Sequence, residues 1–184
     1  MERINPSSRA DRYGKRINRE PYPLLAYSLP YFSIMLASIV PMVLITAEMP
    51  IVPPLGFMML LGWRIMRPGL LPQWVGLPLG AFDDLVSGQP FGSAILLWSL
   101  AMIAIELVEA RFPWRGFWQD WMAAGVATPI YILLAMLCSG AKFSGVLLMV
   151  SLPQMLVAVI LYPGVARLVA WLDQLRLMRL RDVS

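Results

Sequence analysis

The sequence predicts an all-α polytopic membrane protein with six transmembrane helices. Hydrophobic residues make up 59% of the chain and charged residues only 14%, and apolar stretches of membrane-spanning length recur from Leu24 to Leu172. A soluble domain of this size would not leave its helices apolar on every face. We therefore expect a six-helix membrane domain over residues 24–172, preceded by a basic cytoplasmic tail (1–23) and followed by a basic cytoplasmic end (173–184).

Apolar continuity places the helices one after another along the chain. The second is short, because Pro53 and Pro54 interrupt its start and Arg64 arrives well before the roughly 20 residues that a full crossing prefers. The expected spans are residues 24–47, 51–66, 69–87, 90–110, 118–141 and 145–172.

The distribution of basic residues orients the helices, because cytoplasmic loops next to membrane spans are rich in Lys and Arg. If all six spans cross, the arginines of the tail, of the second and fourth connections and of the C-terminal end share one side, and Lys142 alone lies on the other. If the short second span did not cross, this asymmetry would disappear. The sequence thus predicts six crossings with both termini in the cytoplasm.

Residues near the predicted cytoplasmic boundary have ordinary interfacial interpretations. The basic tail suits either a topology-setting flank or attraction to anionic lipid or an acidic partner, and the first is favoured. Glu106 and Glu109 suit ion pairs with nearby arginines better than a proton relay. Four tryptophans at this depth are interpreted as interface anchors: Trp63, Trp114, Trp118 and Trp121.

The composition excludes most catalytic classes. The chain has no histidine, so it cannot build a His-based metal site or a Ser-His or Cys-His nucleophile pair. Its single cysteine, Cys138, lies in an apolar run and is interpreted as a small buried hydrophobe. No glycine-rich phosphate loop follows a strand pattern. We predict no catalytic residue, no metal, no cofactor and no nucleic-acid partner.

Small residues four apart favour close helix contacts. Gly76 and Gly80 form such a pair in the third span, and Ala123 and Ala127 form one in the fifth. These four residues are predicted to pack helices together within the chain or to contact a partner.

Two adjacent acids, Asp83 and Asp84, lie between long apolar runs. Asp84 falls about one turn before the end of the third span, with Gly88 as the helix terminator and Pro90 opening the fourth. A carboxylate there opposes the macrodipole of its own helix. We expect Asp84 to accept hydrogen bonds from the turn at Ser87–Ser93, while Asp83 remains available to solvent or a partner. The alternative is a pair of solvated acids in a loop.

This segment resembles the signature of the rod shape-determining protein MreD family, which has a Gly-x-x-x-Asp-Leu-x-Ser-Gly segment followed by a glycine one turn into the next helix. Pro54, Trp63 and Pro68 upstream and Tyr162-Pro163 near the end are similar to further family features. Asp83 departs from the pattern, because the family usually has an apolar or amide residue there. The matching motif residues are Gly80, Asp84, Leu85, Ser87, Gly88, Pro90 and Gly92.

The resemblance implies a non-catalytic subunit of the bacterial inner membrane that maintains rod cell shape. Implied partners are the single-pass protein MreC and, through it, MreB filaments, a SEDS-family glycosyltransferase and a class B penicillin-binding protein of peptidoglycan synthesis. It also implies a fold similar to the substrate-binding subunits of energy-coupling-factor transporters. The alternative function is therefore a small-molecule-binding transporter subunit, although Ser33 and Ala37 replace the Ala-xxx-Ala docking motif of such subunits.

The topology is tested by reporter fusions after Ser87 and Ser184. The charge distribution predicts a periplasmic signal from the first fusion and a cytoplasmic signal from the second. A cytoplasmic signal at Ser87 would mean that the second span does not cross, and the orientation of every later helix would then be wrong.

Overall fold

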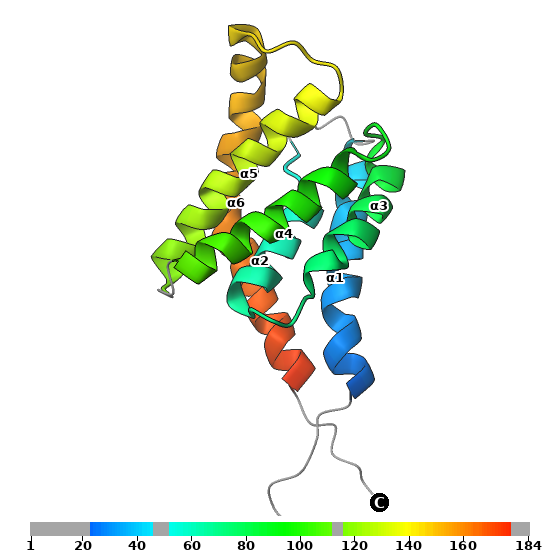
Figure 1. Ribbon diagram of the computed structural model, residues 1–184, viewed down its shortest axis with the longest axis vertical. Coiled ribbons are helices and arrows are strands. Elements are labelled where there is room, and N and C mark those ends of the chain that lie inside the picture. Colours follow the sequence, from blue (N-terminus) through cyan, green and yellow to red (C-terminus); the bar gives the residue numbers. More distant parts are fainter. Residues whose placement is uncertain (1–22, 46–51, 112–115, 178–184) are drawn as a thin grey trace, which may run out of the picture.

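The computed structural model describes residues 23–45, 52–111 and 116–177, with side chains of the first helix described from Tyr27 to Val43. The described residues form helices joined by short connections and contain no strand. Their order is α1 (Pro23–Ile45), α2 (Leu55–Met66), the short 3-10 helix η2 (Gln73–Val75), α3 (Gly76–Ser87), α4 (Ser93–Arg111), α5 (Phe117–Cys138) and α6 (Gly145–Leu177). Figure 1 shows them as one elongated bundle.

All six predicted helices are present, and most boundaries agree to within a few residues. The third begins at Gly76 and not near residue 69, because Gly69 adopts a left-handed φ of 85° and a loop and η2 precede the helix. The sixth continues to Leu177, so it is about 50 Å long at 1.5 Å per residue. It therefore exceeds the thickness of the hydrocarbon core.

By length and composition, α4, α5 and α6 are able to span a membrane. The chain is thus a helical membrane protein, while α2 and α3 have only 12 residues each and rise about 18 Å. The described start of α1 and the end of α6 lie at the same end of the bundle (Figure 1).

The short helix α2 lies at the centre of the structure. Every residue from Gly56 to Arg64 is buried, and α1, α4, α5 and α6 all contact the helix. The approach to α1 is close, because a Cβ on Gly56 would lie 2.1 Å from the Ser38 hydroxyl oxygen. An apolar helix of this kind has no polar face to present to water, and the other helices shield it from lipid as well.

The sequence interpretations of Trp63 and Cys138 are wrong. Trp63 is not an interface anchor, because it is fully buried and its indole N–H donates to the Ser33 hydroxyl at 2.9 Å. Cys138 is exposed and not buried. Trp118 is 69% exposed, as an interfacial ring would be, and Trp114 lies outside the described residues.

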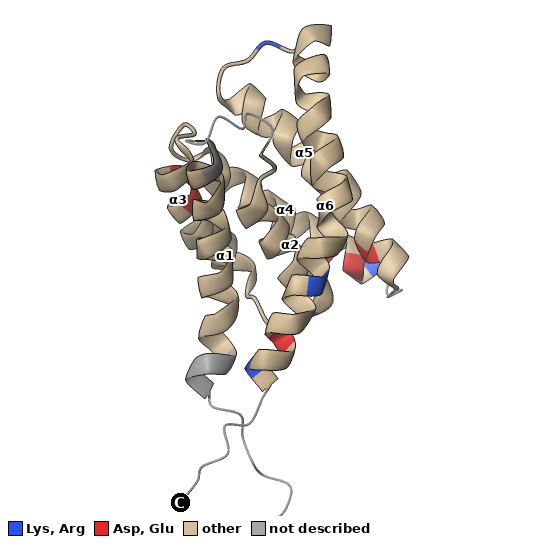
Figure 2. Cartoon of the chain, turned by 180° about the vertical axis from the view of Figure 1, so that it is seen from behind, with Lys and Arg blue, Asp and Glu red and all other residues tan. Residues whose placement is uncertain are grey.

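Charged side chains hold the α2–α3 loop against the end of α6. Asp173 accepts from Arg67 Nε at 2.7 Å and pairs with Arg176 at 2.9 Å. Arg64, although 5% exposed, pairs with Glu109 of α4 at 3.0 Å. Glu109 therefore makes an ion pair, as expected, but with an arginine of α2. Figure 2 shows charges gathered toward this end of the bundle and few along the middle of the helices.

Candidate functional site

The turn between α3 and α4 contains the signature motif, and its backbone explains two of the glycines. Gly88 ends α3 with φ 69°, and Gly92 precedes α4 with φ 101°. Both values lie in the left-handed region that side chains with a Cβ disfavour. The chain consequently reverses direction within five residues, and α4 packs along α3 as an antiparallel neighbour.

Asp84 binds the start of α4 from the preceding helix. Its carboxylate accepts from the backbone N–H of Gly92 and Ala94, both at 2.8 Å, and of Ile95 at 3.3 Å. The Ser93 hydroxyl donates to the same carboxylate at 3.1 Å. The prediction that this turn donates hydrogen bonds to Asp84 is confirmed, and the bonds extend into the first turn of α4.

These contacts explain why Asp84 lies near the C-terminal end of α3, where the macrodipole of that helix disfavours a carboxylate. The first N–H groups of a helix have no partner within that helix, and they carry the positive end of its macrodipole. Asp84 supplies an acceptor and a negative charge to α4 in the manner of an N-cap, although it lies nine residues before Ser93. The unfavourable interaction with the C-terminal end of α3 is therefore offset by α4.

Asp83 lies on a different face of α3 and does not remain accessible. It is 7% exposed, so the expectation that it faces solvent is wrong for this chain. Its carboxylate interacts with the Ser38 side chain of α1, although that hydroxyl forms no hydrogen bond of standard geometry in the described part of the chain. Asp83 is thus a buried acid whose compensation is weaker than that of Asp84.

The structure places Gly76 and Gly80 against the backbone of α4. A Cβ on Gly80 would lie 2.7 Å from the Ala94 carbonyl oxygen, and one on Gly76 would lie 2.9 Å from the Ser99 nitrogen. The atoms in the way belong to the main chain and cannot rotate aside. Small residues at these positions allow the approach that brings Asp84 to the start of α4.

The second pair of small residues is placed differently. Ala123 is exposed and Ala127 half-buried, and both line a groove between α4 and α5.

The remaining motif residues lie at the outer edge of the turn. Leu85 is 74% exposed. Ser87, Gly88 and Pro90 are exposed as well, and Gly92 is half-buried.

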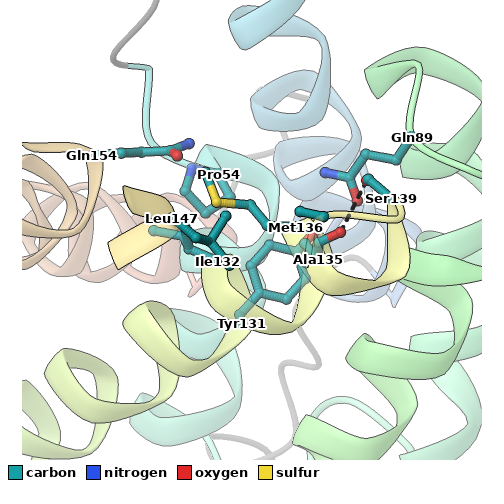
Figure 3. A pocket seen from close by; sticks show the side chains of 10 residues that line it. Pro54, Gln89, Tyr131, Ile132, Ala135, Met136, Ser139, Leu147 and Gln154 are labelled. Atoms are coloured by element: carbon teal, nitrogen blue, oxygen red, sulfur yellow. Dashed lines mark hydrogen bonds between the residues drawn. The ribbon is translucent and has the colours of Figure 1, made fainter. Parts of the chain in front are cut away.

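A pocket of about 420 Å³ lies between the α3–α4 turn, the start of α2 and the α5–α6 connection. In Figure 3 Gln89 and Gln154 lie on opposite sides of it, with Tyr131 between them. Gln154 donates to the Val52 carbonyl at 2.8 Å. The Tyr131 hydroxyl lies beside the side chains of Gln89 and Trp98. Among the described residues it has no hydrogen bond of standard geometry, nor has the Trp98 indole nitrogen.

The sequence alone did not identify the residues that surround the motif in space. Ser38, Trp98 and Tyr131 come from three other helices, and nothing in their local sequence indicates that they meet near α3. Ser93 could have been found, because a serine directly before an apolar helix is a common N-terminal signal. In the described ranges no cluster of three metal-ligating side chains occurs.

The described helices, three of which are long and apolar enough to cross a membrane, define a helical membrane protein. A family model described as rod shape-determining protein MreD matches residues 21–173, which include all the described helices except the last turn of α6. The chain therefore belongs to the MreD family, and the resemblance seen in the motif is confirmed. Neither a curated protein nor a solved structure gives a match, so the similarity to energy-coupling-factor subunits stays a prediction.

The cap is tested by comparing Asp84→Ala with Asp83→Asn. Loss of Asp84 leaves buried N–H groups of α4 without an acceptor, and we expect it to cost about 2 to 4 kcal/mol of stability. Asp83→Asn removes a weakly compensated buried charge and should be neutral or stabilising. Thermal unfolding of the purified protein in detergent measures both, with Ser87→Ala as the exposed control. Equal melting temperatures for the two acid variants would contradict the distinction.

The close approach of α3 and α4 is tested by Gly80→Ala. Its methyl group would overlap the main chain of α4, and we expect a loss of about 1 to 3 kcal/mol. Gly164→Ala in α6 is the matched control, because nothing lies within 4 Å of its Cβ position. That change should be neutral or stabilise the helix by up to about 1 kcal/mol. The same unfolding assay applies, and similar effects of both variants would refute the contact.

Proposed function

We propose that this member of the MreD family is a non-catalytic inner-membrane subunit of the rod complex. It supports MreC and, through MreC, MreB filaments and lateral peptidoglycan synthesis by a SEDS-family glycosyltransferase and a class B penicillin-binding protein. The observation that carries the proposal is the family match over residues 21–173. The absence of histidine from the sequence supports a role without catalysis.

The proposed topology has six crossings and two cytoplasmic termini. The position of the described start of α1 and end of α6 at one end of the bundle supports an even number of crossings (Figure 1). The shortness of α2 is compatible with this topology, because the helix is enclosed by protein. Backbone at membrane depth is tolerated where protein, and not lipid, surrounds it.

The outer edge of the α3–α4 turn is the surface that we assign to MreC. Leu85 and Phe91 are 74% and 72% exposed, and they project from a turn whose shape is held by the Asp84 contacts. Because the turn is already fixed, a partner that covers these two side chains orders little of the backbone, and binding costs little conformational entropy. The contact assigned here uses Leu85, since Asp83 is buried in this chain.

The alternative function, a small-molecule-binding transporter subunit, is favoured by one observation. The 420 Å³ pocket beside Tyr131, Gln89 and Gln154 combines apolar walls with a few polar groups, as ligand sites do. Affinity purification from detergent separates the two functions. Recovery of MreC supports the rod complex, whereas recovery of an ATPase module with a bound vitamin supports the transporter.

The assigned contact is tested by Leu85→Ser, with Ile160→Ser as the control. Ile160 is 75% exposed on α6, so both variants exchange an exposed apolar side chain for a hydroxyl. We expect Leu85→Ser to lower MreC recovery and to leave cells of a deletion strain rounded, while Ile160→Ser restores rods at the same expression level. Normal recovery and normal shape with Leu85→Ser would contradict the assignment.

A further inference from the structure

The long helix α6 has a weak point at Pro163. Proline has no N–H, so the carbonyl of Val159, four residues earlier, lacks the donor that a regular helix provides. Gly164 follows directly and lowers the helix propensity further. Sharp bends in helices occur mostly at proline and at small residues of this kind. The two parts of α6 on either side of Pro163 can therefore change their relative direction more easily than the parts of an unbroken helix.

A tryptophan of the neighbouring helix supplies the missing donor. The half-buried Trp121 of α5 donates its indole N–H to the Val159 carbonyl at 3.2 Å. The preceding residue, Asp120, lies within electrostatic reach of the buried Tyr162. A proline in a membrane helix is tolerated when a neighbouring helix satisfies the carbonyl that it frees. Trp121 is therefore an interhelical donor and not the interface anchor that the sequence predicts.

The part of α6 that follows the proline, from Gly164 to Leu177, is here called the α6 arm. It includes all the charged residues of the helix, which are Arg167, Asp173 and Arg176. The arm packs on α2 through the fully buried Val169, because a Cβ on Gly62 would lie 3.0 Å from that side chain. Farther along, Asp173 accepts from Arg67 Nε at 2.7 Å. Both contacts require that the arm leave Pro163 in one particular direction.

We propose that Pro163 is a hinge of α6 and that Trp121 sets its bend. While the indole N–H occupies the Val159 carbonyl, α6 keeps the direction that brings Val169 beside Gly62 and Asp173 to Arg67. Without that donor the carbonyl must be satisfied by water or by a different local helix geometry. The arm then adopts more than one direction relative to the rest of the bundle.

A double-mutant cycle tests the hydrogen bond. Trp121→Phe keeps an aromatic ring but removes the N–H, and we expect it to lower the Tm of the purified full chain by about 3 to 6 °C. Pro163→Ala gives residue 163 an N–H that can donate to Val159 within α6, so Trp121→Phe should then lower the Tm by less than about 1 °C. Pro153→Ala is the matched control, because Val159 still lacks a helical donor and the full loss should remain. Trp118→Phe, at a position 69% exposed, should leave the Tm unchanged.

Distances between spin labels test the hinge. The labels are attached to introduced cysteines after Cys138, the only cysteine of the chain, has been replaced by alanine. One label at Leu96 of α4 is paired with a second on α6, either before the proline at Leu156 or in the arm at Gln174, and all three positions are exposed. We expect Trp121→Phe to broaden the distance distribution to Gln174 and to leave that to Leu156 unchanged.

Three results would overturn the proposal. They are a Tm that does not fall in Trp121→Phe, a loss of Tm that is as large with Pro163→Ala as with Pro153→Ala, and an unchanged distance distribution to Gln174. Neither measurement involves MreC or cell shape, so failure here leaves the proposed function untouched.

Discussion

The hydrogen bonds between the Asp84 carboxylate and the start of α4 are the interaction on which the packing of α3 against α4 depends. It joins two helices that are consecutive in sequence and antiparallel in space, and it gives α4 the acceptor that its first N–H groups lack. A carboxylate can reach these groups only if the two backbones are close. Gly76 and Gly80 provide that closeness, so the signature acts as one unit in which small residues permit a contact that the acid completes.

The same arrangement explains why Asp83, which precedes Asp84 in the chain, has a different role. Successive residues on a helix point about 100° apart, so when Asp84 faces α4, Asp83 is directed toward α1 and Ser38. The charge of Asp83 is buried with weaker compensation than that of Asp84. The Tyr131 hydroxyl and the Trp98 indole nitrogen, which form no hydrogen bond of standard geometry with other described residues, lie in the same region. Buried polar groups of this kind specify one packing arrangement only when each of them has a hydrogen-bond partner.

The sequence was sufficient to locate the helices, because apolar continuity and proline breaks are local properties of the chain. It also indicated that Asp84 needs a partner, since a carboxylate at a helix C-terminus is unfavourable by itself. It failed for Trp63 and Asp83, whose burial depends on which helices surround them. It likewise missed the pairing of Arg64 with Glu109, residues 45 positions apart. Long-range placement of this kind is decided by packing, and a single sequence without relatives carries little information about it.

The two ends of α4 are held in contrasting ways, and this contrast bears on the proposed function. At its start α4 is fixed to α3 by main-chain contact and by four hydrogen bonds to one carboxylate. At its other end it is attached through Glu109 to Arg64, while its outer face and that of α5 leave a groove between them. A partner that binds the fixed end meets a surface held by hydrogen bonds to Asp84, whereas the groove side presents apolar side chains of α4 and α5. Under the proposed function, the fixed end of α4 supplies a rigid contact surface for a partner, and its apolar groove side faces the bilayer.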